Sequence, residues 1–110
     1  MLRANEVNNL TVDEVADGLA AGRMLLVDVR EPNETTAESF PDAVAMPLSR
    51  FDPALIPQGK QVVFVCRSGR RSVTASLAAQ HAGYAYKSHL AGGILAWKAA
   101  GLPTKTGERR

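Results

Sequence analysis

The sequence is poor in aromatic residues and in net charge, and it has no long apolar run. Aromatic residues make up 5% of the 110 residues, and the formal net charge is only +2. A nucleic-acid-binding protein more often carries a basic stripe with interleaved aromatic residues, so we expect no nucleic-acid partner. No apolar run reaches the length of a membrane-spanning helix, and residues 1–6 lack the apolar core of a signal peptide. We therefore expect a cytoplasmic protein with no membrane partner.

Cysteine and histidine are also scarce. The single cysteine, Cys66, cannot form an intrachain disulfide, which leaves its thiol free for chemistry or for packing. Two isolated histidines, His81 and His89, do not make a cluster of metal ligands, so we expect no metal and no cofactor. A Cys–His hydrolase is disfavoured as well, because neither histidine lies in a supporting motif.

Apolar runs and helix-like segments alternate along the chain. This alternation predicts an α/β fold in which helices cover both faces of a mostly parallel central sheet. We expect one domain over residues 1–110, because the length suits one domain and no repeat or linker divides it. Its core is expected at about residues 7–103, and residues 104–110 are predicted to form a frayed, flexible tail.

Local signals place the elements. Thr11 and Glu14 have the spacing of a capping box, and the apolar residues behind them recur at helical spacing until Gly22. Short apolar runs predict strands at 24–29, 43–46, 62–65 and within 84–90. Further helices are expected after Pro32, over 73–82, and after Gly92-Gly93 as far as about Ala100. Residues 49–59 are expected to be a loop with about one helical turn.

Cys66 lies on a short loop between a predicted buried strand and the start of a predicted helix. Backbone N–H groups at a helix start point at such a loop, and the helix dipole favours negative charge there. Three arginines lie on the same loop, namely Arg67, Arg70 and Arg71. These influences lower the pKa of a thiol and so produce thiolate near neutral pH. Cys66 is therefore predicted to be a nucleophile that acts on an anion.

Asp28 lies near the end of one predicted strand, and Cys66 lies just past the end of another. In open α/β sheets ligands bind beyond the carboxyl ends of the strands, so parallel strands would bring both residues to one edge. We expect Asp28 and Arg30 to be structural rather than catalytic, since a strand-end carboxylate commonly caps backbone donors or pairs with arginine. Trp97 is expected to pack in the core or at its rim, and Gly92-Gly93 to give a tight entry to the last helix.

Three blocks together resemble a known family. Asp28-Val29-Arg30-Glu31-Pro32 is similar to an early Asp-Val-Arg-Glu element of the single-domain rhodaneses, the thiosulfate sulfurtransferase-like family. The stretch from Cys66 to Ser72 resembles the active-site loop of that family. Its C-terminal signature is matched by Leu90-Ala91-Gly92-Gly93-Ile94-Leu95-Ala96-Trp97 and the following Gly101-Leu102-Pro103. The resemblance covers residues 7–103 and implies a small rhodanese-like domain.

The resemblance implies sulfur transfer through a persulfide. Cys66 thiolate would attack the outer sulfur of a small anionic donor such as thiosulfate, and a thiol, cyanide or protein acceptor would then take that sulfur. The persulfide-binding loop implied is Arg67, Ser68, Gly69, Arg70, Arg71 and Ser72, whose backbone N–H groups would stabilise the persulfide anion. Gly69 permits the tight curvature, and Arg71 matches the family's loop-closing arginine. Arg67 and Arg70 are candidates for attracting the donor, because a guanidinium pairs well with oxyanions.

One segment departs from the family pattern. Where the family often has Gly-His-Ile-Pro-Gly-Ala, this chain has Glu38-Ser39-Phe40-Pro41-Asp42-Ala43. Glycine tolerates backbone angles that Asp42 adopts less readily, so the turn is expected to differ. The contribution of this segment to substrate or partner contact is left open.

Two alternatives to a free-standing sulfurtransferase stay open. The first is a cysteine-based phosphatase or arsenate reductase. The resemblance to cysteine-based phosphatases implies five residues between cysteine and arginine, whereas four separate Cys66 from Arg71, a loop length that favours a single sulfur atom over phosphate. A rhodanese-like module for sulfur relay or binding is the second alternative. The presence of both Cys66 and Arg71 argues against an inactive module, but it does not separate an enzyme from a relay component. The sequence does not determine the physiological donor, the acceptor or the oligomeric state.

Overall fold

The core of the fold is a five-stranded sheet in which every pair of neighbouring strands is parallel. The computed structural model describes residues 6–107. The strand order is β1-β6-β5-β2-β4. The strands are β1 (Asn8–Leu10), β2 (Met24–Asp28), β4 (Val44–Ala45), β5 (Gln61–Val65) and β6 (Ser88–Leu90). The parallel sheet confirms the predicted α/β fold.

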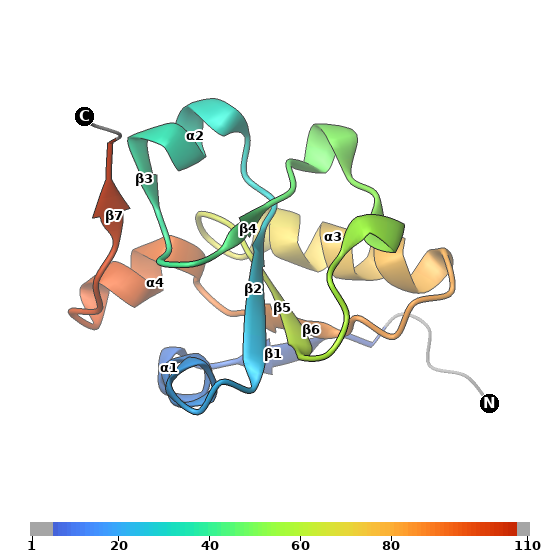
Figure 1. Cartoon of the computed structure of the whole chain (residues 1–110), viewed down its shortest axis with the longest axis horizontal. Helices are drawn as coiled ribbons and strands as arrows, with labels where there is room; N and C mark the ends of the chain where they lie inside the picture. The colour runs from blue at the N-terminus through green and yellow to red at the C-terminus, as the bar shows by residue number, and fades with distance from the viewer. Residues whose placement is uncertain (1–5, 108–110) are drawn as a thin grey trace.

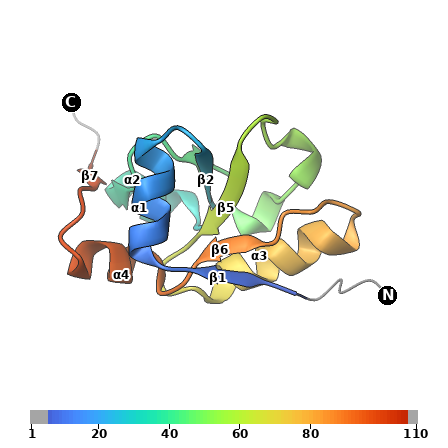
Figure 2. The same cartoon turned by 90° about the horizontal axis from the view of Figure 1, so that it is seen from below.

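Helices cover both faces of this sheet, as predicted (Figures 1 and 2). The α-helices are α1 (Val12–Ala20), α2 (Pro32–Ala37), α3 (Arg70–His81) and α4 (Gly93–Ala99). Two short 3₁₀ helices, η1 (Leu48–Arg50) and η2 (Pro53–Leu55), lie in the predicted loop. The capping box predicted for α1 is present, with the Glu14 N–H donating to Thr11 Oγ1 and the Thr11 N–H to Glu14 Oε1.

The buried apolar residues form two clusters, and successive residues of a strand belong to different clusters. Val63 and Val65 of β5 belong to the cluster that includes Val15 of α1 and Trp97 of α4. The intervening Phe64 belongs to the second cluster, which includes Cys66 and two alanines of α3, Ala75 and Ala79. Successive strand side chains point to opposite faces, so β5 is covered on both sides. The near-continuous apolar run that predicted this strand follows from that double burial.

The C-terminal segment differs from its prediction. Lys105–Thr106 forms β7, which pairs antiparallel with β3 (Glu38–Ser39), and the Gly107 N–H donates to the Ala37 carbonyl at 2.8 Å. The predicted frayed tail is therefore wrong for residues 104–107, and residues 108–110 lie outside the described part of the chain. Figure 1 shows β7 beside β3. A two-residue strand has no periodicity of its own, which explains why the sequence did not reveal it.

The segment that departs from the family pattern, residues 38–43, contains β3 and the tight turn that leads to β4. Asp42 takes φ 58°, the left-handed region that glycine adopts at no steric cost. An aspartate therefore adopts the backbone angles that its side chain disfavours. Phe40, two residues before Asp42, is buried and packs edge-on against Trp97, with ring centroids 5.4 Å apart. The buried ring fixes one side of this turn in the core.

Candidate active site at the cysteine loop

The cysteine loop lies at the carboxyl edge of the parallel sheet. β5 ends at Val65, Cys66 follows it, and α3 begins at Arg70. Asp28 at the end of β2 is the register partner of Val65. The expectation that Asp28 and Cys66 share one edge of the sheet is confirmed. This is the edge at which open α/β folds bind ligands.

The Cys66 sulfur is buried inside the curve of its own loop. The Gly69 N–H donates to Sγ at 3.0 Å, and Ser72 Oγ lies 3.5 Å from Sγ. Gly69 takes φ 107°, which turns its N–H back toward the sulfur and starts α3. Burial raises the pKa of the Cys66 thiol, but hydrogen bonds from the Ser72 hydroxyl and from loop N–H groups outweigh it, so the pKa is lowered overall. The loop is built to hold a sulfur anion.

The N-terminus of α4 holds the loop from the other side. The Ile94 N–H donates to the Cys66 carbonyl at 2.9 Å, and the Leu95 N–H donates to the Arg67 carbonyl at 3.2 Å. Gly93 takes φ 58°, and a Cβ there would overlap both of those carbonyls. The two glycines thus give the tight helix entry that was predicted. The absent side chain of Gly93 lets α4 donate directly to the backbone of the cysteine loop, and that of Gly92 leaves room for Ala96.

The three loop arginines have different surroundings. Arg71 binds Glu34 of α2 through two hydrogen bonds, at 2.6 and 2.9 Å. The Arg71 hydrogen bonds lower the pKa of Glu34 to about 2, and the same contact raises the pKa of Arg71. Arg67 and Arg70 are exposed, and within residues 6–107 neither forms an ion pair. Their predicted role toward an anionic donor stays a prediction.

Asp28 and Arg30, for which a structural role was predicted, form a buried ion pair. Arg30 Nη2 donates to Asp28 Oδ2 at 2.8 Å, and the Arg30 N–H donates to Asp28 Oδ1 at 3.0 Å. Arg30 Nη2 also donates to the Glu38 carbonyl at 2.8 Å. The pair therefore ties the end of β2 to the start of β3. This contact supports a structural role, because both charges are satisfied by each other and by the backbone.

His89 is the site residue that sequence reasoning missed. Its Nδ1 lies 2.7 Å from Ser72 Oγ, and its Nε2 lies 2.7 Å from Asn9 Oδ1 on β1. His89 is therefore one hydroxyl group away from the nucleophile candidate. The available signal was a polar residue at the centre of a buried strand, but no motif pointed from it to Cys66. His81, the other histidine, is exposed at the end of α3.

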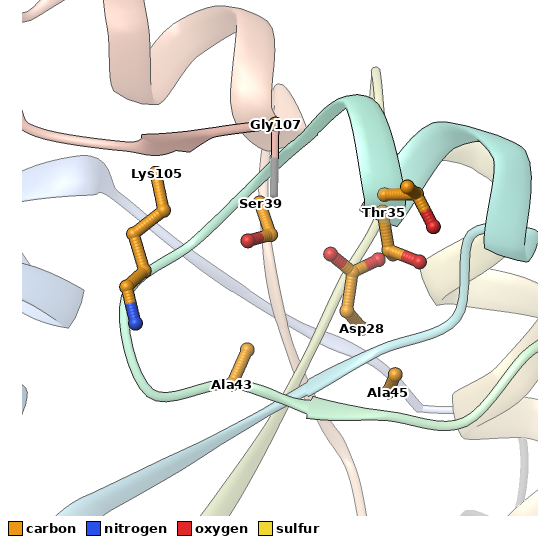
Figure 3. A pocket seen from close by; sticks show the side chains of 8 residues that line it. Asp28, Thr35, Ser39, Ala43, Ala45, Lys105 and Gly107 are labelled. Atoms are coloured by element: carbon orange, nitrogen blue, oxygen red, sulfur yellow. The ribbon is translucent and has the colours of Figure 1, made fainter. Parts of the chain in front are cut away.

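A pocket of about 390 Å³ with a mixed polar and apolar lining opens next to Asp28. Figure 3 shows Asp28 and Lys105 on different sides of it, with Ser39 and Thr35 contributing hydroxyl groups. Ser39 and Ala43 belong to the departing segment, so this segment forms part of the pocket wall. Cys66 is not among the lining residues, and Asp28 at the end of β2 is the lining residue that belongs to the same sheet edge as the cysteine loop.

Within residues 6–107, no group of three or more His, Cys, Asp or Glu side chains is placed to hold a metal ion. None of the helices described there has both the length and the apolar character needed to cross a membrane.

Comparison with known proteins decides the family. Residues 11–100 match the family model described as the rhodanese-like domain. The chain belongs to this family. A sulfurtransferase from Allochromatium vinosum is 37% identical over 100 residues, an alignment that covers 88% of this chain and 94% of that protein. The uncharacterized protein slr1261 of Synechocystis is 49% identical over 83 residues, which cover 74% of this chain. The match spans only 46% of that second protein.

Solved structures show the same fold. The thiosulfate sulfurtransferase from Pseudomonas aeruginosa superposes with a TM-score of 0.81 at 24% identity, covering 94% of this chain and 21% of that chain. At that identity the likeness shows the fold alone. The chain thus belongs to a sulfurtransferase-type family and has the fold of that family. Its buried cysteine loop lies at the carboxyl edge of the sheet.

Proposed function

We propose that this rhodanese-like domain is a sulfurtransferase that carries sulfane sulfur on Cys66. The observation that carries the proposal is the Gly69 N–H donating to Cys66 Sγ at 3.0 Å, inside a loop with four residues between Cys66 and Arg71. A backbone donor aimed at one sulfur stabilises the anion without needing to reorganise. The sulfurtransferase of Allochromatium vinosum, related over nearly its whole length, supports the same reaction class.

The reaction proceeds in two displacements. Cys66 thiolate attacks the outer sulfur of thiosulfate or a similar donor, the S–S bond of the donor breaks, and sulfite leaves with the bonding pair. An acceptor such as a thiolate, cyanide or a protein cysteine then attacks the outer sulfur of the persulfide. The S–S bond of the persulfide breaks, and the Cys66 thiolate is regenerated. No oxidant or reductant is consumed in this exchange.

The loop side chains have separate tasks in this proposal. The exposed guanidinium groups of Arg67 and Arg70 attract the anionic donor to the loop. Arg71 anchors the start of α3 to α2 through Glu34 and so keeps the loop closed. The reaction needs a free thiol, and a reducing cytoplasmic location suits that need.

The test is a mass spectrum of the protein after treatment with thiosulfate. We expect a mass gain of one sulfur atom that maps to Cys66, its loss on adding acceptor, and ping-pong kinetics in the steady state. The Cys66→Ser variant is the control and should neither gain the sulfur nor turn over. An unchanged mass in the wild type, or full activity in Cys66→Ser, would sink the proposal. A phosphate-ester assay run in parallel tests the phosphatase alternative.

A second function, sulfur relay within a longer protein, is favoured by one observation. The match to the Synechocystis protein spans less than half of that protein, so similar domains occur within longer chains. A relay domain would load sulfur on Cys66 but pass it slowly to small acceptors. Fast loading combined with slow transfer to both thiol and cyanide would therefore favour the relay function.

A further inference from the structure

Four polar side chains from four segments form one hydrogen-bonded series that ends at the buried sulfur. Cys66 Sγ lies 3.5 Å from Ser72 Oγ, which lies 2.7 Å from His89 Nδ1, and His89 Nε2 lies 2.7 Å from Asn9 Oδ1. Cys66 follows β5, Ser72 belongs to α3, His89 to β6 and Asn9 to β1. Figure 2 shows β1 beside β6, with α3 running along the same side.

Burial differs sharply along the series. Cys66, Ser72 and His89 are 1%, 0% and 3% exposed, whereas Asn9 is exposed to solvent. The series therefore connects a sulfur with almost no solvent contact to the protein surface. Burying three polar groups costs free energy that an apolar set would avoid. An arrangement of this kind calls for a function at the sulfur.

The contacts fit one arrangement of protons on the neutral His89 ring. Asn9 Oδ1 accepts, so His89 Nε2 carries a proton, and His89 Nδ1 is then the unprotonated nitrogen. That nitrogen accepts from the Ser72 hydroxyl, whose oxygen is free to accept from the Cys66 thiol. The Gly69 carbonyl, 3.2 Å from Ser72 Oγ, is the only competing acceptor that the described residues offer to the same hydroxyl. The thiol and hydroxyl donors of the series thus point from the sulfur toward the histidine, and the His89 Nε2–H points on to Asn9.

We propose that Ser72 and His89 relay the proton of the Cys66 thiol away from the sulfur, with Asn9 fixing the histidine tautomer. The inference takes Cys66 as the nucleophile, as the proposed function does. The thiol proton moves to Ser72 Oγ while the Ser72 hydroxyl proton moves to His89 Nδ1. The products are Cys66 thiolate and a His89 imidazolium. The reset Ser72 hydroxyl then donates to the thiolate, and the imidazolium donates to Ser72 and to Asn9.

The surroundings of His89 suit a proton acceptor. Burial lowers the pKa of His89, so the ring is neutral near pH 7 and able to take a proton. Its hydrogen-bond partners from β1 and α3 are Asn9 and Ser72, and β5 pairs Phe64 with it; none of these side chains titrates. Cys66 is the titrating group that the hydrogen-bonded series joins to His89, through Ser72. On α3, the charged Arg71 is directed to Glu34.

Two measurements on the donor-free protein test the relay. The first is the rate of Cys66 alkylation by iodoacetamide as a function of pH. We expect His89→Gln to raise the apparent pKa of Cys66 by about one unit, which slows alkylation near neutral pH about tenfold. His81→Gln, which changes the exposed histidine, is the matched control and should leave the profile unchanged. An identical profile for folded His89→Gln and His81→Gln would overturn the relay.

The second measurement avoids any change at His89. Nitrogen chemical shifts of the His89 ring report its protonation in the wild type and in Cys66→Ala. The relay predicts a higher His89 pKa when Cys66 is present, because the thiolate favours the imidazolium. Equal values in both proteins would contradict the relay even if His89→Gln failed to fold. If Cys66 forms no persulfide but the titrations of Cys66 and His89 are coupled, the proposed function alone is contradicted. If Cys66 forms a persulfide but the two titrations are not coupled, the relay alone is contradicted.

Discussion

Glu34 of α2 and Arg71 of α3 form a two-point ion pair, with hydrogen bonds of 2.6 and 2.9 Å. The pair joins the helix that follows β2 to the helix that follows β5, across the sheet edge where the cysteine loop lies. Glu34 is also part of the capping box that starts α2, accepting from the Glu31 N–H at 3.1 Å. The position of the loop therefore depends on a side chain 32 residues before Cys66 in the sequence.

Replacing Arg71 with Ala should reduce sulfur transfer far more than replacing Arg70 with Ala. Arg71→Ala removes the tie to α2 and frees the start of α3, whereas Arg70 is exposed and has no ion-pair partner among the described residues. We expect a loss of about tenfold or more in kcat/KM for Arg71→Ala, and about threefold or less for Arg70→Ala, as for a steering charge. Equal losses in a steady-state thiosulfate assay would show that the roles are misassigned.

The Glu34–Arg71 pair should make stability depend on pH in acid. The pKa of Glu34 is about 2 in the folded protein against 4.5 as its ordinary value, so its contribution is complete above about pH 4.5 and is lost as pH falls toward 2. Both side chains are part exposed, at 25% and 34%, so we expect only about 1 kcal/mol. Denaturant unfolding of the wild type and of Glu34→Gln, at neutral pH and in acid, measures the contribution of the pair to the free energy of unfolding. A difference between the two proteins that persists unchanged in acid would contradict the assignment.

Gly93→Ala should disrupt the cysteine loop more than an alanine at another left-handed glycine. A Cβ at Gly93 would overlap the carbonyls of Cys66 and Arg67, whereas Gly101, at φ 80°, has open space around it. We expect a loss of about 2 kcal/mol or more for Gly93→Ala and about 1 kcal/mol for Gly101→Ala, which carries backbone strain only. Unfolding curves give the stabilities, and Cys66 alkylation reports the loop. Similar losses in both variants would rule out the close contact as the cause.

Asp42→Gly should stabilise the protein. Asp42 sits at φ 58°, where a Cβ costs free energy that glycine avoids, although glycine loses more backbone entropy on folding. We expect a net gain of about 0.5 kcal/mol in the free energy of unfolding. Asp42→Ala is the control, since it removes the charge and keeps the Cβ. If Asp42→Ala stabilises as much as Asp42→Gly, the effect comes from the carboxylate and not from the backbone.

Local signals predicted much of the fold, and long-range contacts account for the misses. Thr11 and Glu14 lie three residues apart and cap each other, so the start of α1 could be read directly. The position of Cys66 past β5 could also be read, because the apolar run before it is continuous. His89 and Asn9 meet across 80 residues through the pairing of β6 with β1, and a single sequence carries no signal for that pairing.

The ordered C-terminal segment is a miss of the same kind. Lys105 and Thr106 form a strand only because Glu38 and Ser39 offer a partner edge, and Thr104 Oγ1 donates to Glu38 Oε2 at 2.6 Å. Intrinsic strand preference over two residues is too weak to predict such a pairing. Residues 104–107 and the departing segment are thus held together by several contacts, which neither stretch indicates when taken alone.

The β3–β7 pairing matters for how the protein is handled in the laboratory. Lys105 and Gly107 line the pocket beside Asp28, so a variant shortened to end before Lys105 would lose one side of that pocket together with β7. Glu38 and Ser39 would then lack their strand partner. A variant trimmed for crystallisation therefore has to keep residues 104–107 if its kinetics are to be compared with those of the 110-residue chain.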